Sequence, residues 1–131
     1  QLHEQVHLLG FKSNPYAYVS KADIYVLSSL YEGFPNGMTE AMILGKPIVS
    51  VNCLSGPSEI LKDNEYGILI DQYEEDEFTD EITKGDQELA QAIEKLLKDP
   101  QSLIYYEKQA LQRGNDFLID SIADQWLNLE V

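Results

Sequence analysis

Two glutamates, Glu32 and Glu40, are the residues whose type and spacing best suit chemistry at a binding site. They flank a loop that contains Gly33, Pro35 and Gly37, residue types that interrupt regular structure. A carboxylate in such a loop can accept two hydrogen bonds from a vicinal diol such as that of a ribose, each contributing roughly 1.5–3 kcal/mol. An alternative needs no ligand: if Gly37 is the N-cap of a helix, Glu40 stands at position N3, where an acid stabilises the helix.

The segments around the loop predict one strand–helix–strand unit. Residues 24–27 form a short apolar run that predicts a buried parallel strand. From Gly37 to Leu44 apolar residues recur at three- and four-residue steps, as on a buried helix face, and Gly45 is placed to end that helix in a left-handed cap. Residues 48–51 predict the next strand. The loop therefore lies beyond the carboxyl end of the first strand, where open α/β sheets bind ligands and helix starts attract phosphate.

The same stretch resembles a known sequence signature. Glu32 and Glu40 are separated by seven residues within Glu-Gly-Phe-Pro, then Glu-Ala-Met, then Gly-Lys-Pro-Ile-Val. This pattern resembles the E-x7-E motif of retaining, nucleotide-sugar-dependent glycosyltransferases of the GT-B fold. The resemblance continues into Gly56-Pro57-Ser58-Glu59-Ile60 and covers roughly residues 6–118. It implies transfer of a sugar from a nucleotide sugar, such as a UDP- or GDP-sugar, to a glycan or lipid-linked acceptor with retention at the anomeric carbon.

The resemblance also implies a role for each residue of the loop. Glu40 would bind the ribose diol, and Glu32, the candidate catalytic residue, would orient hydroxyls of the donor sugar. Backbone N–H groups from Phe34 to Thr39 would hold sugar hydroxyls and phosphate. In such enzymes the departing phosphate oxygen assists the attacking hydroxyl, so we expect no metal and no cofactor. The predicted donor-binding residues are Gly33, Phe34, Pro35, Asn36, Gly37, Met38, Thr39 and Glu40.

Beyond the loop, helices and strands alternate along the chain. The fold class is therefore α/β, a Rossmann-like doubly wound parallel sheet with C-terminal helices, in a single domain over residues 1–131. The resemblance makes this an incomplete C-terminal, donor-binding domain of a GT-B fold. Further predicted elements are a strand at 6–11, a helix from Pro15 to about Lys21 capped by Ser13 or Asn14, a short helix with Pro57 at N1, a strand at 67–70, and helices at 86–98, 101–117 and 121–129.

The resemblance implies that part of the domain is missing. Its first two strands are absent, together with the Arg and Lys that the family uses to hold the diphosphate. In the usual strand order 3-2-1-4-5-6, strands at 6–10 and 24–27 would not be neighbours, so we expect a different pairing or exposed sheet edges. We also expect the isolated chain to be inactive. The chain begins at Gln1 rather than Met, and its first predicted strand starts at once, so we expect a fragment of a longer protein. It has no basic, apolar leader, so we expect no signal peptide.

Residues 71–88 form an unusually acidic segment. They hold nine acidic residues against the lone Lys84, and the family joins the flanking elements by a shorter and less acidic link. We therefore predict an acidic loop insertion over 71–88. The acids do not follow the pattern of a calcium-binding loop, and a solvated loop is the favoured interpretation.

Charge and composition exclude several classes of partner. The formal net charge is −14, which argues against nucleic acid and against docking of this segment on an anionic membrane. No segment has the run of about 18 apolar residues that a transmembrane helix needs. The chain has only one arginine, Arg113, so a nucleotide diphosphate would find little positive charge. With His3 and His7 the only histidines, no histidine-based metal site or catalytic triad can be assembled.

The single cysteine, Cys53, indicates the cellular location. It excludes an internal disulfide and suits a reducing compartment, and we expect it to be a small buried hydrophobe. We therefore expect a cytoplasmic protein that contacts a membrane, if at all, through the missing domain.

Two other functions remain open. One is a nucleotide-sugar epimerase of the same fold, which a strong pH optimum set by a histidine or carboxylate base would favour. The other is a non-catalytic α/β module that binds a nucleotide or a protein. That second alternative gains if Glu40 is buried in a cap or salt bridge and no cleft lies at Phe34–Thr39.

Overall fold

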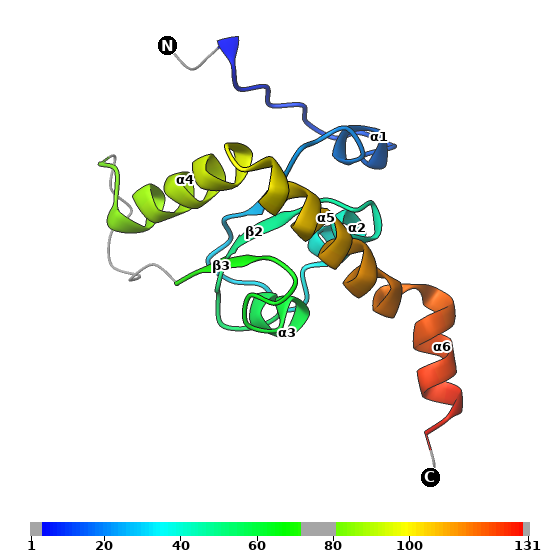
Figure 1. Ribbon diagram of the computed structural model, residues 1–131. Helices are drawn as coiled ribbons and strands as arrows, with labels where there is room; N and C mark the ends of the chain where they lie inside the picture. The colour runs from blue at the N-terminus through cyan, green and yellow to red at the C-terminus, as the bar shows by residue number, and fades with distance from the viewer. Residues whose placement is uncertain (1–3, 72–80, 130–131) are drawn as a thin grey trace.

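A three-stranded parallel sheet forms the centre of the molecule (Figure 1). The computed structural model describes residues 4–71 and 81–129. The strands are β1 (Tyr25–Leu27), β2 (Ile48–Val51) and β3 (Ile68–Ile70), in the order β1-β2-β3. All three were predicted, because each is a short apolar run between turn-forming residues.

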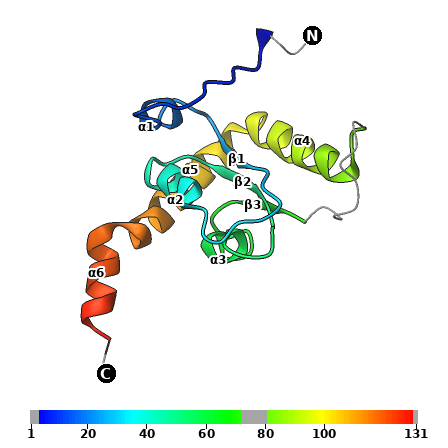
Figure 2. The same cartoon turned by 180° about the vertical axis from the view of Figure 1, so that it is seen from behind.

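Helices connect and cover these strands (Figures 1 and 2). The chain passes from β1 through α2 to β2, and then through α3 to β3, as in other parallel sheets. Within residues 81–129 the regular elements are all helical. The helices are α1 (Tyr16–Val19), α2 (Asn36–Ile43), α3 (Pro57–Leu61), α4 (Lys84–Leu97), α5 (Pro100–Gly114) and α6 (Ile119–Leu127), with a 3₁₀ turn η2 (Asn115–Phe117) between the last two.

Both faces of the sheet are covered, which confirms the predicted fold class. Side chains alternate between the faces along a strand. Ile48 of β2 faces α2 and α3 and is buried in one core cluster with Met42 and Leu61. Val49 and Val51 are fully buried but lie outside that cluster, on the opposite face. We place α4 on that face, because it contacts both β2 and β3.

The end of α2 was also predicted correctly. Gly45 has a φ of 70°, the left-handed conformation that glycine adopts without strain. Its N–H donates to the Met42 carbonyl, and the N–H of Lys46 donates to the Ala41 carbonyl. This pair of bonds is a Schellman motif, which satisfies carbonyls left without partners at the end of the helix.

The strand predicted at residues 6–11 does not form. This segment lies outside the sheet, and Phe11 is 94% exposed. An alternating apolar pattern stabilises a strand only where a neighbouring strand and a covering layer are present, and here the segment has neither. The sheet therefore begins at β1, which pairs only with β2 among the described residues. Val26 of β1 is 38% exposed and no residue of β1 is fully buried, so the prediction that this strand is buried is wrong as well.

Several helix boundaries differ from those predicted. Pro15 is the N-cap of α1 rather than its first residue, and α1 ends at Val19. α4 begins at Lys84 because Thr83 and Asp86 form a capping box, in which each side chain bonds the other residue's backbone N–H. Residues 84–88 of the predicted acidic loop are therefore helical. The central part of that loop, residues 72–80, lies outside the described residues, so the insertion stays a prediction.

The C-terminal helix α6 extends away from the rest of the molecule (Figures 1 and 2). None of its residues is buried, and Trp126 is 72% exposed. Cys53, in contrast, is buried, as predicted.

The N-cap of α5 leads to a prediction about pH. The Asp99 carboxylate accepts hydrogen bonds from the Ser102 hydroxyl and from the backbone N–H groups of Ser102 and Gln101. These bonds, with the Ser102 hydroxyl first, lower the pKa of Asp99 below its ordinary value. A carboxyl whose pKa is lowered by folding stabilises the protein above its unfolded-state pKa, and the effect is lost as pH falls through the folded-state pKa.

We expect Asp99→Asn to reduce the loss of thermal stability below about pH 4. Asparagine remains a good N-cap, so the variant should fold at neutral pH. Melting temperatures between pH 7 and pH 2 measure the effect. Ser102→Ala removes one of the bonds and should lie between the wild type and Asp99→Asn. Equal acid sensitivity of all three proteins would contradict the prediction.

Candidate functional site

The loop before α2 lies at the carboxyl end of β1, as predicted from the sequence. α2 begins at Asn36, with Pro35 as its N-cap and no side chain capping the helix start. The N–H groups of Met38 and Thr39 donate to the Pro35 carbonyl, at 2.9 and 3.4 Å. Asn36 and Gly37 thus occupy positions N1 and N2, whose N–H groups point out of a helix and suit an anion.

The observed helix start changes the interpretation of Glu40. With Pro35 as the N-cap, Met38 stands at N3 and Glu40 at N5, so the alternative that places Glu40 at N3 of a helix capped by Gly37 is wrong. Its Oε1 instead accepts a hydrogen bond of 3.2 Å from the hydroxyl of Tyr16 on α1. No ion pair within residues 4–71 and 81–129 involves Glu40. Its carboxylate therefore has neither of the structural roles that would favour a non-catalytic module.

Tyr25 of β1 lies beside the start of α2. Its hydroxyl oxygen lies only 2.7 Å from where a Cβ would stand on Gly37. Burial raises the pKa of Tyr25, and the negative charges of Glu32 and Glu40 raise it further. Both carboxylates are thus close enough to affect the same phenol at the start of α2. Neither Tyr16 nor Tyr25 is among the site residues predicted from the sequence, although strand alternation places Tyr25 on the face that α2 covers.

The start of α3 supports the loop from the side. Gly56 has a φ of 89°, and a Cβ on it would lie 2.5 Å from Pro35 Cδ and 3.1 Å from the Gly33 carbonyl oxygen. The hydroxyl of Ser55 donates to the backbone carbonyl of Glu32. A larger residue at position 56 would displace the loop, so the Ser55-Gly56 segment helps to fix the position of the loop from Glu32 to Pro35.

Arg113 of α5 binds backbone carbonyls of α3, next to the loop. Its Nε donates to the Ile60 carbonyl at 2.9 Å, and a second nitrogen donates to the Glu59 carbonyl at 3.2 Å. The guanidinium also lies 4.7 Å from the ring centre of Phe117, whose edge packs against Phe34 of the loop. The only arginine of the chain is therefore engaged with the end of α3, and it is not placed as a free cation for a diphosphate.

We expect Arg113→Met to lower the free energy of unfolding by about 2 kcal/mol, because two charge-assisted bonds to carbonyls are lost while the apolar stem is kept. Urea denaturation measures the change. Lys108→Met, an exposed site on the same helix, is the control and should change it by less than about 0.5 kcal/mol. A similarly small change for Arg113→Met would contradict this account.

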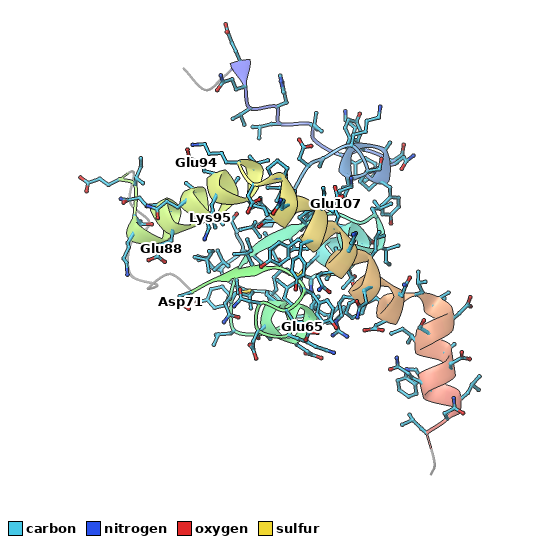
Figure 3. The ribbon with its side chains drawn as sticks, viewed as in Figure 1. Glu65, Asp71, Glu88, Glu94, Lys95 and Glu107 are labelled. Atoms are coloured by element: carbon cyan, nitrogen blue, oxygen red, sulfur yellow. The ribbon has the colours of Figure 1, made fainter. Side chains whose placement is uncertain are left out.

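The middle of the loop is open to solvent. Phe34 and Asn36 are exposed, and two pockets of the described part lie elsewhere. One, under α1, is lined by Tyr18 and Lys21. The other lies between β3 and α4; of its lining residues, Asp71, Glu88 and Lys95 are labelled in Figure 3.

Within residues 4–71 and 81–129, no three or more His, Cys, Asp or Glu side chains are grouped so that they could hold a metal ion. In the same residues, no helix combines the length and apolar character that crossing a bilayer requires. The expected independence from metals and cofactors stays a prediction.

Comparison with known proteins assigns the family. The profile described as Glycosyl transferases group 1 matches residues 1–85, so the chain belongs to this family of glycosyltransferases. It is 29% identical to an uncharacterized glycosyltransferase of Methanocaldococcus jannaschii, over 95% of this chain and 35% of the relative. It is 30% identical to a poly(ribitol-phosphate) alpha-N-acetylglucosaminyltransferase of Staphylococcus aureus, over 98% of this chain and 24% of the relative.

A solved structure agrees with this assignment. A Staphylococcus aureus TarM variant, crystallised with fondaparinux, alpha-GlcNAc-glycerol and UDP, is similar to this chain with a TM-score of 0.78 and 27% identity. The similarity covers 98% of this chain and 24% of TarM. The chain thus has the fold of part of a GT-B glycosyltransferase, and it spans only about a quarter to a third of these relatives.

Proposed function

We propose that the full-length protein transfers a sugar from a nucleotide sugar to a glycan or lipid-linked acceptor, with retention at the anomeric carbon. The donor would bind to the donor surface, which we define as residues 32–40. The observation that carries this proposal is the position of Glu40 at N5, beside a helix start without a side-chain cap and without an ion-pair partner among the described residues. Membership of the family and the UDP in the TarM crystals support it.

Each part of the donor surface suits one part of a nucleotide sugar. The N–H groups at N1 and N2 of α2 can donate to a phosphate oxygen. Glu40 can accept hydrogen bonds from the ribose diol, since an ionised carboxylate has about four acceptor positions. Glu32, at the other end of the loop, would orient hydroxyls of the sugar. Transfer is favoured over epimerisation and over non-catalytic binding because the relatives are named glycosyltransferases.

The electrostatics of the chain limit what it can do by itself. Arg113 is engaged with α3, and the net charge is −14. Cations for the diphosphate would then come from the rest of the full-length protein, so the 131-residue chain alone would not turn over substrate. A cytoplasmic location, with membrane contact through the rest of the protein, is part of the same proposal.

The proposal is tested by titrating the full-length protein with UDP, GDP and UDP-sugars while observing the amide NMR signals of residues 33–40. We expect selective shifts of these signals for one nucleotide. Incubation of the matching nucleotide sugar with an acceptor should then give a product of unchanged anomeric configuration. Absence of shifts for every nucleotide at millimolar concentration would contradict the proposal, and so would release of an altered nucleotide sugar without transfer.

A further inference from the structure

We infer that Tyr16 is a positioning residue of the donor surface, whose hydroxyl fixes the Glu40 carboxylate in the orientation that accepts the ribose diol of a nucleoside diphosphate. This inference rests on the proposed function. The motif that contains Glu40 does not include Tyr16, which lies 24 residues earlier on a different helix.

The fold holds Tyr16 against α2. Val19 of α1 packs against the core cluster, and Tyr16, three residues earlier, lies on the same face of that helix. The two views of the molecule both place α1 next to α2 (Figures 1 and 2). From this position the Tyr16 hydroxyl reaches Glu40 Oε1 at 3.2 Å. Val19 is thus the anchor, and the phenol is the group that extends to the donor surface.

The chemistry of the pair assigns the donor and the acceptor. A tyrosine phenol keeps its proton at neutral pH, and the hydrogen bond to Glu40 and the charge of its carboxylate raise the pKa of Tyr16 further. The phenol is therefore the donor. A carboxylate has about four acceptor positions, and Tyr16 uses one of them. The remaining positions are available to a diol.

Fixing Glu40 in advance favours binding. An exposed glutamate loses rotamer freedom when a ligand orders it, and a group that is already held in the bound orientation loses less. No ion pair holds Glu40 in the part of the chain that the structure describes. The bond from Tyr16 is therefore the interaction that can supply this order.

Tyr16→Phe tests the inference, because it removes only the hydroxyl. We expect it to weaken binding of UDP or GDP to the full-length protein about 3- to 10-fold by isothermal titration calorimetry, with an unchanged melting temperature. Tyr18→Phe is the matched control: it lies on the same helix and is 48% exposed, against 47% for Tyr16. It should bind as the wild type does.

Two further measurements separate positioning from a general structural role. In a Glu40→Gln background, Tyr16→Phe should have no further effect, because Tyr16 acts through the Glu40 carboxylate. The loss caused by Tyr16→Phe should also shrink for a 2′-deoxynucleoside diphosphate, which lacks the diol.

The outcomes distinguish failure of this inference from failure of the proposed function. If Tyr16→Phe binds as well as the wild type or better, or loses the same factor in the Glu40→Gln background, the inference is wrong and the proposed function stands. If neither UDP nor GDP binds the wild-type protein, or if binding does not depend on Glu40, the proposed function is wrong and the inference is wrong with it.

Discussion

Gly114→Ala is expected to lower the free energy of unfolding by about 3 kcal/mol, because an added methyl group overlaps the backbone of a neighbouring helix. Gly114 is the last residue of α5 and lies against the end of α2. A Cβ there would lie 2.8 Å from the backbone nitrogen of Ile43 and 2.9 Å from both Ile43 Cα and the carbonyl carbon of Met42. These atoms belong to the backbone of α2, so the overlap is relieved only by moving α5 and α2 apart, and the other end of α2 carries the donor surface.

The effect arises from packing rather than from backbone conformation. Gly114 has a helical φ of −56°, which alanine adopts readily. Gly33→Ala is the control, since its added Cβ would meet no atom within 4 Å, and its unfolding free energy should change by less than about 0.5 kcal/mol. Urea denaturation followed by circular dichroism compares the two variants with the wild type. A Gly114→Ala variant as stable as the wild type would mean that α2 and α5 are not packed this closely.

The second large effect concerns binding of the donor. Glu40→Gln is expected to weaken binding of UDP or GDP about 10- to 100-fold, because hydrogen bonds from the ribose diol to a charged acceptor are replaced by bonds to a neutral one. The substitution keeps the shape of the side chain, and Glu40 is only partly buried on α2. The fold should therefore be unaffected, and calorimetric titration of the full-length protein measures the loss directly.

Glu32→Gln is expected to affect recognition of the donor sugar but not binding of the nucleotide. Glu32 is proposed to orient hydroxyls of the donor sugar, so its substitution should lower the rate of sugar transfer and leave UDP or GDP affinity almost unchanged. Glu107→Gln, on the exposed side of α5, is the control for loss of a carboxylate and should alter neither quantity. Weaker nucleotide binding in Glu32→Gln with normal binding in Glu40→Gln would reverse the proposed roles of the two residues.

The sequence by itself determined the features that depend on residues close together along the chain. The three strands are short apolar runs. α2 ends at Ile43 because Gly45, just past its C-cap, takes the left-handed conformation that terminates the helix. α3 begins at Pro57 because proline fits a first helical turn. The family also followed from local information, since the motif around Glu32 and Glu40 is one continuous stretch.

Only the tertiary structure decided which groups surround those motif residues. Spacing alone allowed Glu40 to stand at N3 of a helix capped by Gly37. In the structure the N-cap is Pro35, and the Glu40 carboxylate accepts a hydrogen bond from Tyr16. Residues 6–11 have a strand-like pattern yet stay outside the sheet. An apolar pattern stabilises a strand only where it pairs with a neighbouring strand. Arg113 reaches carbonyls more than 50 residues away. Such contacts form between segments that are far apart in the sequence, so no local sequence pattern predicts them.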